Sequence, residues 1–327
     1  MKVFIYNLRE FDEKMFFDNL KPEYGYDYIG YPGYQELSNI PLVKGCEAVS
    51  ILASECTDEI LEAFAANGIK YLLTRSIGTD HINLEKCRQL GIRVGRSQYS
   101  PNSVANYTIM LMLMVCRRFA HIEKRVEVQD YSFKGKMGRE LSNCTVGIVG
   151  TGKIGQTVIE HLHGFGCRIL AYDLYPNHSL DSLAEYVSLD ELLECCDILS
   201  LHAPATKDNY HLIDKSALAR MKDGVMIINA ARGTLVDSDA LIEGIESGKV
   251  GGAALDVLED EAGLYYRNLS GEVLTNHQMA ILKSFPNVIL SPHTAFYTDD
   301  AVAEMCRCVF ESVRAFEAGE DNPLEAT

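Results

Sequence analysis

The sequence has no apolar stretch as long as a membrane span, which needs about 18 such residues. Its ten cysteines form no CxxC pair, so the spacing typical of zinc and redox motifs is missing. The first residues, MKVFIYNL, are too short and lack the cleavage site of a signal peptide. We therefore expect a cytoplasmic protein with reduced, buried thiols, no metal site and no membrane partner.

Basic residues are also in the minority. The chain has 30 Lys and Arg against 46 Asp and Glu, a formal net charge of −16. So acidic a chain repels nucleic-acid phosphates and anionic lipids, and we expect neither as a partner. An anionic small molecule would need a local cationic site against this field.

Short β-rich runs alternate with helical patterns along the whole chain. Four runs occupy residues 2–6, 48–52, 71–75 and 92–96, and a helix is expected at 57–68, between Thr57 as cap and Gly68. A second series of six β-rich runs starts after Cys144 and comprises TVGIVG, RILAYD, DILSLHAP, VMIINAARG, GGAALDVLE and NVILSPH. The alternation predicts an α/β fold of two doubly wound parallel-sheet domains, in keeping with the length of 327 residues.

The domain boundaries follow from two helical stretches. Residues 101–122 form a long apolar helical pattern, which we interpret as the first crossing between domains. A last helix after Tyr297 is expected to return to the first domain. The predicted domains are residues 1–99 plus 299–327, and residues 100–298.

The sequence from Gly150 to Gly155, GTGKIG, fits G-x-G-x-x-G between a strand pattern and a helical pattern. Gly150 would allow the tight turn, Gly152 would let the backbone approach a pyrophosphate, and Gly155 would allow close helix–strand packing. Asp173 ends the next strand 18 residues after Gly155, near the spacing of about 20 that the fingerprint requires. Its carboxylate would bind a ribose diol and repel a 2′-phosphate, which favours NAD over NADP. A glycine-rich turn without a ligand is the plainer alternative.

Three polar residues, Arg232, Glu261 and His293, follow late strand patterns. Ligands of a doubly wound sheet bind at the carboxyl ends of its strands, so these side chains are expected to share one crevice. Arginine binds a carboxylate bidentately, histidine can carry a transferable proton, and a hydrogen-bonded carboxylate favours the charged imidazole. The set predicts hydride transfer to a keto acid. Taken one by one, each has a plainer explanation. Arg232 could form a surface ion pair, Glu261 could lie in a solvated acidic loop, and His293 could be a capped histidine.

At these residues the chain resembles the D-2-hydroxyacid dehydrogenase family, and within it the D-lactate dehydrogenases, including those of vancomycin-resistance operons. The resemblance covers nearly the whole chain and depends on TRSIGTDHI (74–82), YSPNSVANY (99–107), TVGIVGTGKIG (145–155), GFGCRILAYD (164–173), LHAPAT (201–206), INAARGTLVD (228–237), GGAALDVLEDE (251–261) and PNVILSPHTAFYT (286–298). It implies a flavodoxin-like catalytic domain, a cleft and a Rossmann NAD domain. It also implies a homodimer through the NAD domains and reduction of pyruvate to D-lactate with NADH.

The resemblance also implies roles for individual residues. Arg232, Glu261 and His293 would be catalytic, with His293 as the acid/base. The backbone N–H groups of Ile77 and Gly78 would help Arg232 bind the substrate carboxylate, and Tyr99 and Phe296 would line the substrate pocket. Cofactor contacts are implied for Gly150, Gly152, Lys153, Ile154, Gly155, Asp173, Ala203, Pro204, Asn209, Ala230, Arg232 and Asp256. Lys153 and Asn106 depart from the residues common in relatives, but neither belongs to the catalytic three.

Two alternatives to D-lactate formation stay open. A bulkier keto acid such as 2-ketoisocaproate, phenylpyruvate or 2-ketoglutarate is one, since a methylene changes discrimination by only about 1–3 kcal/mol. The expected pocket wall comprises residues 51–54, Tyr99 and Phe296. The other alternative is a non-catalytic NAD sensor resembling transcriptional co-repressors of this fold, which can keep the same three residues. The lack of long disordered flanks disfavours it.

Overall fold

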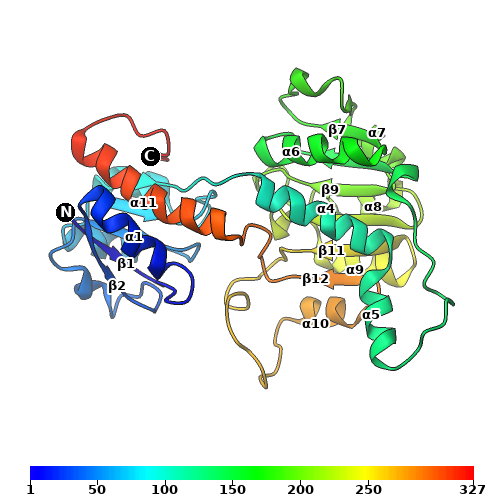
Figure 1. Cartoon of the computed structure of the whole chain (residues 1–327), viewed down its shortest axis with the longest axis horizontal. Coiled ribbons are helices and arrows are strands. Elements are labelled where there is room, and N and C mark those ends of the chain that lie inside the picture. The colour runs from blue at the N-terminus through cyan, green and yellow to red at the C-terminus, as the bar shows by residue number, and fades with distance from the viewer. The chain divides into compact units, whose positions relative to one another are not determined.

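Two units make up the chain, all of which, residues 1–327, is described by the computed structural model (Figure 1). Unit 1 comprises Met1–Ser100 and Tyr297–Thr327, and unit 2 comprises Pro101–Phe296. The first boundary is expected from the sequence after residue 99 and lies after Ser100. The second is expected after residue 298 and lies after Phe296.

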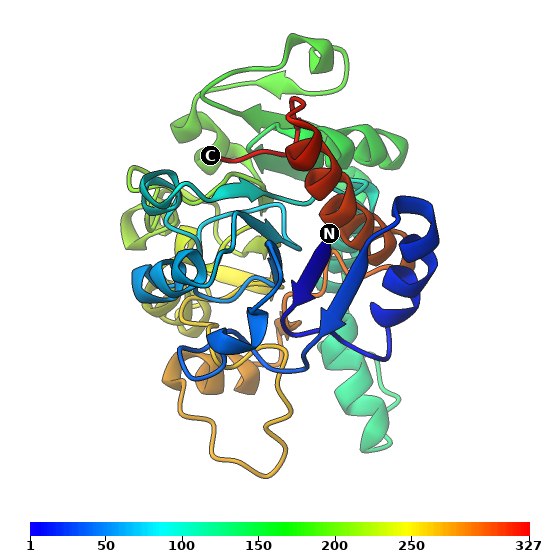
Figure 2. The same cartoon turned by 90° about the vertical axis from the view of Figure 1, so that its left-hand side faces the viewer.

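Unit 1 contains a five-stranded parallel sheet in the order β2-β1-β3-β4-β5 (Figure 2). This is the flavodoxin-like order, so the predicted fold of this unit is confirmed. The strands are β1 (Lys2–Ile5), β2 (Asp27–Gly30), β3 (Ala48–Ile51), β4 (Tyr71–Thr74) and β5 (Arg93–Gly95). Helices α1 (Lys14–Tyr24) and α11 (Asp299–Ala318) pack together, as do α2 (Asp58–Ala66) and α3 (Leu84–Leu90), and a short helix η1 (Ile40–Val43) contacts α2.

Local signals explain the ends of these helices. Thr57 accepts a hydrogen bond from the backbone N–H of Ile60 and so caps α2. Thr298 caps α11 in the same way, and Gly319 ends that helix in a left-handed conformation. The sequence patterns missed β2, because this edge strand is largely exposed and has no apolar alternation.

Unit 2 contains a seven-stranded parallel sheet in the order β12-β11-β10-β9-β6-β7-β8. The strands are β6 (Thr145–Val149), β7 (Arg168–Tyr172), β8 (Glu185–Tyr186), β9 (Ile198–Leu201), β10 (Val225–Asn229), β11 (Val250–Leu255) and β12 (Val288–Leu290). Six were expected, and the two-residue β8 is the addition. The strand order reverses between β6 and β9, where a doubly wound sheet binds its ligand.

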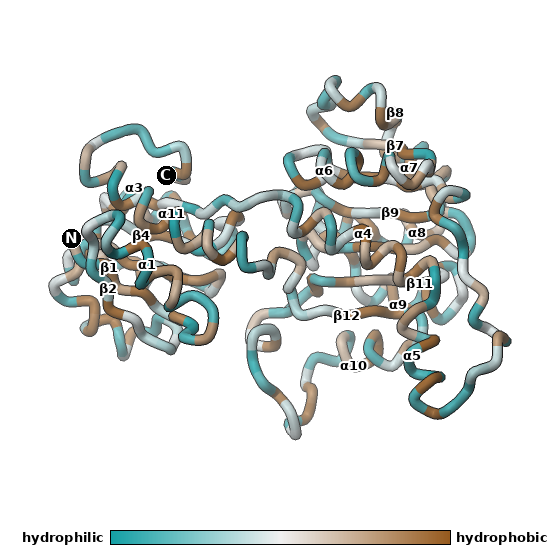
Figure 3. Tube along the Cα trace, in the orientation of Figure 1, coloured by the Kyte–Doolittle hydropathy of each residue, from teal (hydrophilic) through white to brown (hydrophobic).

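Helices cover both faces of this sheet (Figures 1 and 3). The helices α4 (Asn102–Cys116) and α6 (Lys153–Leu162) pack together, and α5 (Phe119–Glu127) follows α4. Four further helices pack in a row, each on the next along the chain: α7 (Leu189–Cys195), α8 (Lys215–Arg220), α9 (Ser238–Glu246) and α10 (His277–Ser284). Short helical turns are η2 (Leu141–Asn143), η3 (His163–Phe165), η4 (His178–Leu180) and η5 (Gly233–Leu235). Two apolar cores result, one on each side of the sheet.

The apolar helix expected over residues 101–122 is a wrong prediction in two respects. It ends at Cys116, because Arg118 adopts a left-handed conformation with φ 51°, and α5 starts after it. It also lies wholly within unit 2, where it packs on α6 and β10, so the crossing precedes it. None of the helices combines the length and apolar composition that crossing a bilayer would require. All ten cysteines are unpaired, and eight of them are buried.

Candidate active site

Three predicted site residues follow three neighbouring strands of unit 2. Arg232 comes three residues after β10, His293 comes three residues after β12, and Glu261 follows β11. Because these strands are adjacent and parallel, their carboxyl ends form one edge of the sheet. The structure therefore places all three residues on that edge.

His293 and Glu261 form a hydrogen-bonded pair. Nδ1 of His293 lies 2.6 Å from Oε1 of Glu261. Since an ionised carboxylate only accepts, Nδ1 carries the hydrogen, and Nε2 is left as the ring atom that can hold or release a proton. Glu261 is itself held, because its Oε2 accepts from the backbone N–H of Leu258 at 2.9 Å. The side chains of the pair are 28% and 27% exposed, so a ligand can reach them.

The loop that carries His293 is fixed by Asp256, whose carboxylate is fully buried. One oxygen, Oδ1, accepts from the Ser291 hydroxyl at 2.6 Å and from the Thr294 N–H at 2.9 Å. The other accepts from the N–H of Ala295 at 2.8 Å. His293 has a φ of 54°, a conformation that costs a non-glycine residue on the order of 1–3 kcal/mol. The contacts of Asp256 offset that cost and hold His293 in place.

The turn that begins at Arg232 contacts the loop that ends at Glu261. The carbonyl of Arg232 accepts from the buried side-chain amide of Asn229 at 2.9 Å. At Gly233, a Cβ atom would lie 2.1 Å from the backbone carbonyl carbon and oxygen of Leu258. No side chain fits there, so glycine allows the two segments to meet at van der Waals distance.

The glycine-rich turn has the shape that a dinucleotide requires. Gly150 has a φ of 93°, and a Cβ on Gly155 would lie 2.0 Å from the Gly150 carbonyl oxygen, so α6 packs directly on this turn. A Cβ on Gly152 would meet no atom within 4 Å, which leaves open space at the start of α6. No side chain caps α6, so its first N–H groups and the positive end of its dipole face that space. Lys153 and Ile154 are the first two residues of the helix.

Asp173 lies beside the same turn. It follows β7, and its Oδ2 accepts from the backbone N–H of Thr151 at 2.6 Å, while Oδ1 accepts from that of Tyr175 at 2.8 Å. This is the place that the dinucleotide fingerprint gives to the ribose-binding acid. Open space for a pyrophosphate and a carboxylate next to it fit NAD.

The remaining predicted cofactor contacts lie at neighbouring strand ends. Ala203 and Pro204 follow β9, and Ala230 follows β10. Asn209 closes the turn after β9, because its side-chain amide donates to the carbonyl of Pro204 at 2.8 Å. Their roles toward the cofactor, and that of Asp256, stay predictions.

One polar atom beside the glycine turn has no partner. His202 precedes Ala203, and its Nε2 lies 2.9 Å from the hydroxyl of Ser200. Its Nδ1 is buried and makes no hydrogen bond. Burial lowers the pKa of His202 to about 4, so the ring is neutral near pH 7. His202 is not among the site residues predicted from the sequence, although its place at a strand end is a usable signal.

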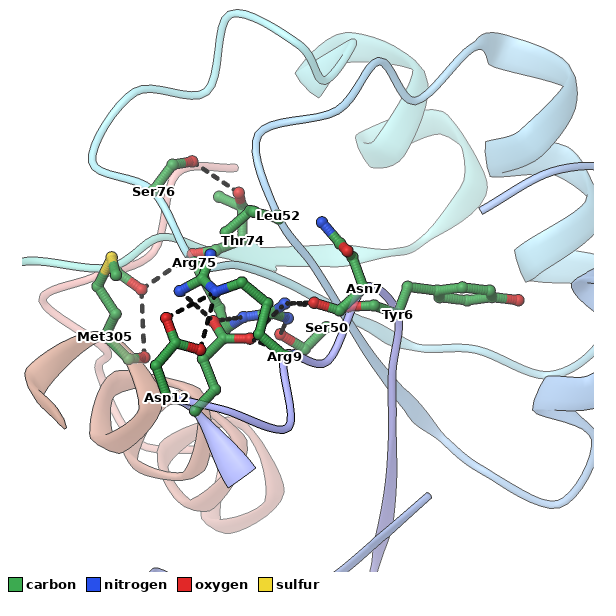
Figure 4. Close-up of polar contacts among 12 residues, drawn as sticks. Tyr6, Asn7, Arg9, Asp12, Ser50, Leu52, Thr74, Arg75, Ser76 and Met305 are labelled. Carbon is green, nitrogen blue, oxygen red and sulfur yellow. Dashed lines mark hydrogen bonds and ion pairs between the residues drawn. The ribbon is translucent and has the colours of Figure 1, made fainter. Parts of the chain in front are cut away.

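In unit 1, Ile77 and Gly78 follow the carboxyl end of β4, directly after a buried ion pair. Nε of Arg75 lies 2.8 Å from Oε1 of Glu13, and neither side chain is exposed. The same guanidinium donates to the hydroxyl of Ser50 and to two carbonyls at the end of β1, those of Tyr6 and Asn7 (Figure 4). Arg75 thereby ties the ends of β1, β3 and β4 together.

The turn after Arg75 is ordered by short-range hydrogen bonds. Ser76 donates from its hydroxyl to the carbonyl of Gly78 at 2.7 Å, and its oxygen also lies 2.7 Å from the Thr74 hydroxyl. Tyr99 lies next to the last residue of the first segment of unit 1, and Phe296 is the last residue of unit 2. The substrate-side roles of Ile77, Gly78, Tyr99 and Phe296 stay predictions.

Sequence patterns do not reveal the residues that hold the pair of His293 and Glu261. Ser291 and Asn229 support the loops of His293 and Arg232, and the hydroxyl of Tyr266 donates to the carbonyl of His293 at 3.1 Å. Ser291 and Tyr266 lie in loops of no repeating pattern, and Asn229 is the last residue of β10, so only the structure identifies these contacts. No group of three or more His, Cys, Asp or Glu side chains is arranged to hold a metal ion.

Comparison with known proteins identifies the family of this site. Residues 109–295 match the family described as D-isomer specific 2-hydroxyacid dehydrogenase, NAD binding domain. The chain belongs to this family. The predicted enzyme class is therefore confirmed, and its cofactor is NAD.

Individual relatives cover nearly the whole chain. An aromatic 2-oxoacid reductase from Clostridium sporogenes is 44% identical over 97% of this chain and 96% of its own length. A D-specific alpha-keto acid dehydrogenase from Enterococcus faecium is 39% identical over 96% of each chain. The crystal structure of a D-lactate dehydrogenase from Treponema pallidum matches all of both chains with a TM-score of 0.90 and 34% identity. All three relatives are named as a reductase or a dehydrogenase. They give no support to the alternative that this chain is a non-catalytic NAD sensor.

Proposed function

We propose that this D-2-hydroxyacid dehydrogenase reduces an apolar 2-keto acid of the phenylpyruvate class with NADH. The observation that carries the chemistry is the 2.6 Å pair of His293 and Glu261, on the same sheet edge as Arg232 and the glycine turn. For the substrate, the support is the 44% identity with an aromatic 2-oxoacid reductase. Pyruvate, the substrate expected from the sequence, is the second candidate, favoured by the likeness to a D-lactate dehydrogenase at 34% identity.

The residues divide the reaction between them. NADH, when bound, supplies the hydride to the carbonyl carbon. Nε2 of protonated His293 gives its proton to the oxygen that becomes the alcohol, and Glu261 stabilises the imidazolium through Nδ1. Arg232 binds the carboxylate of the keto acid through two parallel hydrogen bonds. Oxidation of the alcohol runs in reverse and starts from neutral His293.

The residues expected to form the pocket wall suit an apolar side chain. The segment from Ile51 to Ser54 contains no Lys or Arg, and Ile51 and Leu52 are buried. A second carboxylate, as in 2-ketoglutarate, would have no cationic partner in this segment, and burying it unpaired is costly.

Steady-state kinetics with NADH test the assignment. The compounds are phenylpyruvate, 2-ketoisocaproate, pyruvate and 2-ketoglutarate, compared by kcat/KM. We expect phenylpyruvate to have the highest value and 2-ketoglutarate the lowest. A highest value for pyruvate would establish D-lactate formation instead, and no NADH oxidation with any of the four would contradict the function itself.

We also propose that two copies associate through unit 2 and that the protein works in the cytoplasm. The segment 117–139 exposes large apolar side chains, among them Tyr131 at 73%, Phe133 at 94% and Met137 at 88%. It has seven Lys and Arg against three Asp and Glu, so it is cationic on a chain of net charge −16. Such a patch indicates an interaction site, in which a second copy would cover the exposed apolar side chains. The unpaired cysteines suit a reducing compartment.

A cavity of about 370 Å³ adjoins this segment. Its lining combines apolar side chains with Arg118, His121 and Arg139, and includes Met137. Each copy therefore carries both projecting side chains and a hollow next to them. A projection beside a hollow suits a two-fold symmetric interface, in which the same surface of both partners meets.

A further inference from the structure

A second histidine–carboxylate pair lies close to the catalytic one in unit 2. Nε2 of His211 is 2.6 Å from Oε1 of Glu259, which precedes Glu261 by two residues. Nδ1 of the same ring is 3.7 Å from Oδ2 of Asp237. The imidazole thus faces a carboxylate on either side, and neither contact belongs to the proposed reaction.

This pair connects the two segments that carry catalytic residues. The backbone N–H of His211 donates to the carbonyl of Thr234 at 2.9 Å, in the turn that begins at Arg232. Oε2 of Glu259 accepts from the backbone N–H of Ser238 at 3.2 Å, at the end of that same turn. Glu259 itself belongs to the loop that ends at Glu261. A shift of His211 or Glu259 would therefore move both segments.

The conformation of His211 indicates that this arrangement is held by its contacts. Its φ is 54°, which is unfavourable for a residue other than glycine and persists only where the surroundings fix it. The ring of Tyr210 stacks on the imidazole with a centroid distance of 3.9 Å and an interplanar angle of 18°. The hydroxyl of Tyr210 also donates to Oε1 of Glu259 at 3.4 Å. Stacking and hydrogen bonding thus restrain the ring from different directions.

We infer that His211 and Glu259 are positioning residues that keep the loop of Glu261 aligned with His293 and the turn of Arg232. This inference rests on the proposed function. The catalytic hydrogen bond between Glu261 and His293 depends on where the 258–261 loop lies, because Oε2 of Glu261 is tied to the backbone N–H of Leu258. Small displacements matter for such a site, since a misplacement of about 1 Å can reduce turnover by about 100-fold.

The kinetic test compares His211→Ala and His211→Gln with His178→Ala. Glutamine keeps a side-chain N–H that can reach Glu259, whereas alanine does not. His178 is a matched control, because it lies in the same unit and pairs with Asp181 at 3.2 Å on the surface. We expect His211→Ala to lower kcat by about 10- to 100-fold at unchanged NADH affinity, glutamine to restore part of it, and His178→Ala to behave as wild type. A kcat of His211→Ala equal to that of active wild type would overturn the inference.

A second measurement does not depend on turnover. The ring ¹⁵N resonances of His293, assigned by their loss in His293→Asn, report the tautomer that Glu261 selects. We expect His211→Ala to shift them and His178→Ala to leave them in place. Unchanged His293 resonances in folded His211→Ala would overturn the inference even if no keto acid were reduced. A wild type inactive on every keto acid, with His293 shifted in His211→Ala, would contradict only the proposed function.

Discussion

Three carboxylates of unit 2 accept hydrogen bonds from different donors, and these donors suit the different tasks that we propose for them. Glu261 accepts from an imidazole, which would stabilise the charge that the proposed reaction requires. Asp256 accepts from a hydroxyl and two backbone N–H groups of one loop, so it fixes the position of His293. Asp173 accepts from the glycine turn and lies where a ribose would bind. Residue type alone distinguishes none of these tasks.

Replacing His293 tests the proton donor. His293→Asn keeps a polar side chain but has no transferable proton, so kcat should fall by about 10²- to 10⁴-fold. Affinity for NADH, measured by its fluorescence, should stay unchanged. His178→Asn is the control, since this histidine is exposed in the same unit. Turnover of His293→Asn within twofold of wild type would remove His293 from the mechanism.

Replacing Asp173 tests the choice of cofactor. Asp173→Ala removes the carboxylate that repels a 2′-phosphate, so the ratio of kcat/KM with NADH to that with NADPH should fall by about 10-fold or more. Asp181→Ala serves as the control, because Asp181 is an exposed acid of the same unit. If the ratio stays as in wild type, Asp173 is not the residue that selects NADH.

The buried ring of His202 makes stability depend on pH. Burial lowers its pKa from 6.5 to about 4, so between these values the unfolded chain binds a proton that the folded chain does not. This contribution to the free energy of unfolding is present above pH 6.5 and is lost as the pH falls toward 4, by up to about 3 kcal/mol. Urea unfolding at pH 7 and pH 4.5 should show a smaller decrease in His202→Gln than in wild type. Equal decreases would show that His202 is not responsible.

At the scale of elements, two glycines at the start of α6 differ in what surrounds them. Gly155 is required by the packing of the helix on the turn, because a Cβ there overlaps the Gly150 carbonyl. Gly152 meets no such limit, because open space lies in front of it. Two glycines three residues apart in one motif are thus limited differently, Gly155 by packing and Gly152, as we propose, by the bound cofactor.

Alanine substitutions distinguish these purposes. Gly155→Ala should reduce the free energy of unfolding by about 1–3 kcal/mol, since the helix must move away from the turn. Gly152→Ala should leave stability nearly unchanged but weaken NADH binding by about 10-fold or more, because its methyl group occupies the space of the pyrophosphate. Gly164→Ala is the control for both, since a Cβ there meets no atom within 4 Å. Wild-type NADH affinity in Gly152→Ala would contradict this account.

For the molecule as a whole, the sequence predicts the strands and helices whose hydrophobic residues recur at a regular spacing. Alternating strand and helix patterns predict both sheets, and the rule that ligands bind at strand ends predicts the shared edge of Arg232, Glu261 and His293. The short edge strands β2 and β8 lack the apolar runs that such patterns need. The break after α4 depends on one left-handed residue, Arg118, which hydrophobicity does not encode.

The supporting contacts of the site escape the sequence for another reason. His211 and Glu259 are 48 residues apart, and Asp256 is 38 residues from Thr294, so no local spacing relates them. Only the adjacency of β9, β10, β11 and β12 in the sheet brings their loops together. Residues that share a strand-end site are therefore easier to predict than the contacts that hold their loops.

The oligomeric state is the prediction that belongs to the whole molecule. If two copies associate through the segment 117–139, wild type should sediment at twice the chain mass of 36.4 kDa. Phe133→Glu should shift the equilibrium toward the monomer, because it places a charge where the most exposed apolar side chain of the segment would be buried. Phe11→Glu is the matched control, as Phe11 is 79% exposed but lies in unit 1. A monomeric wild type, or a Phe133→Glu variant as dimeric as Phe11→Glu, would show that this cationic segment has another purpose.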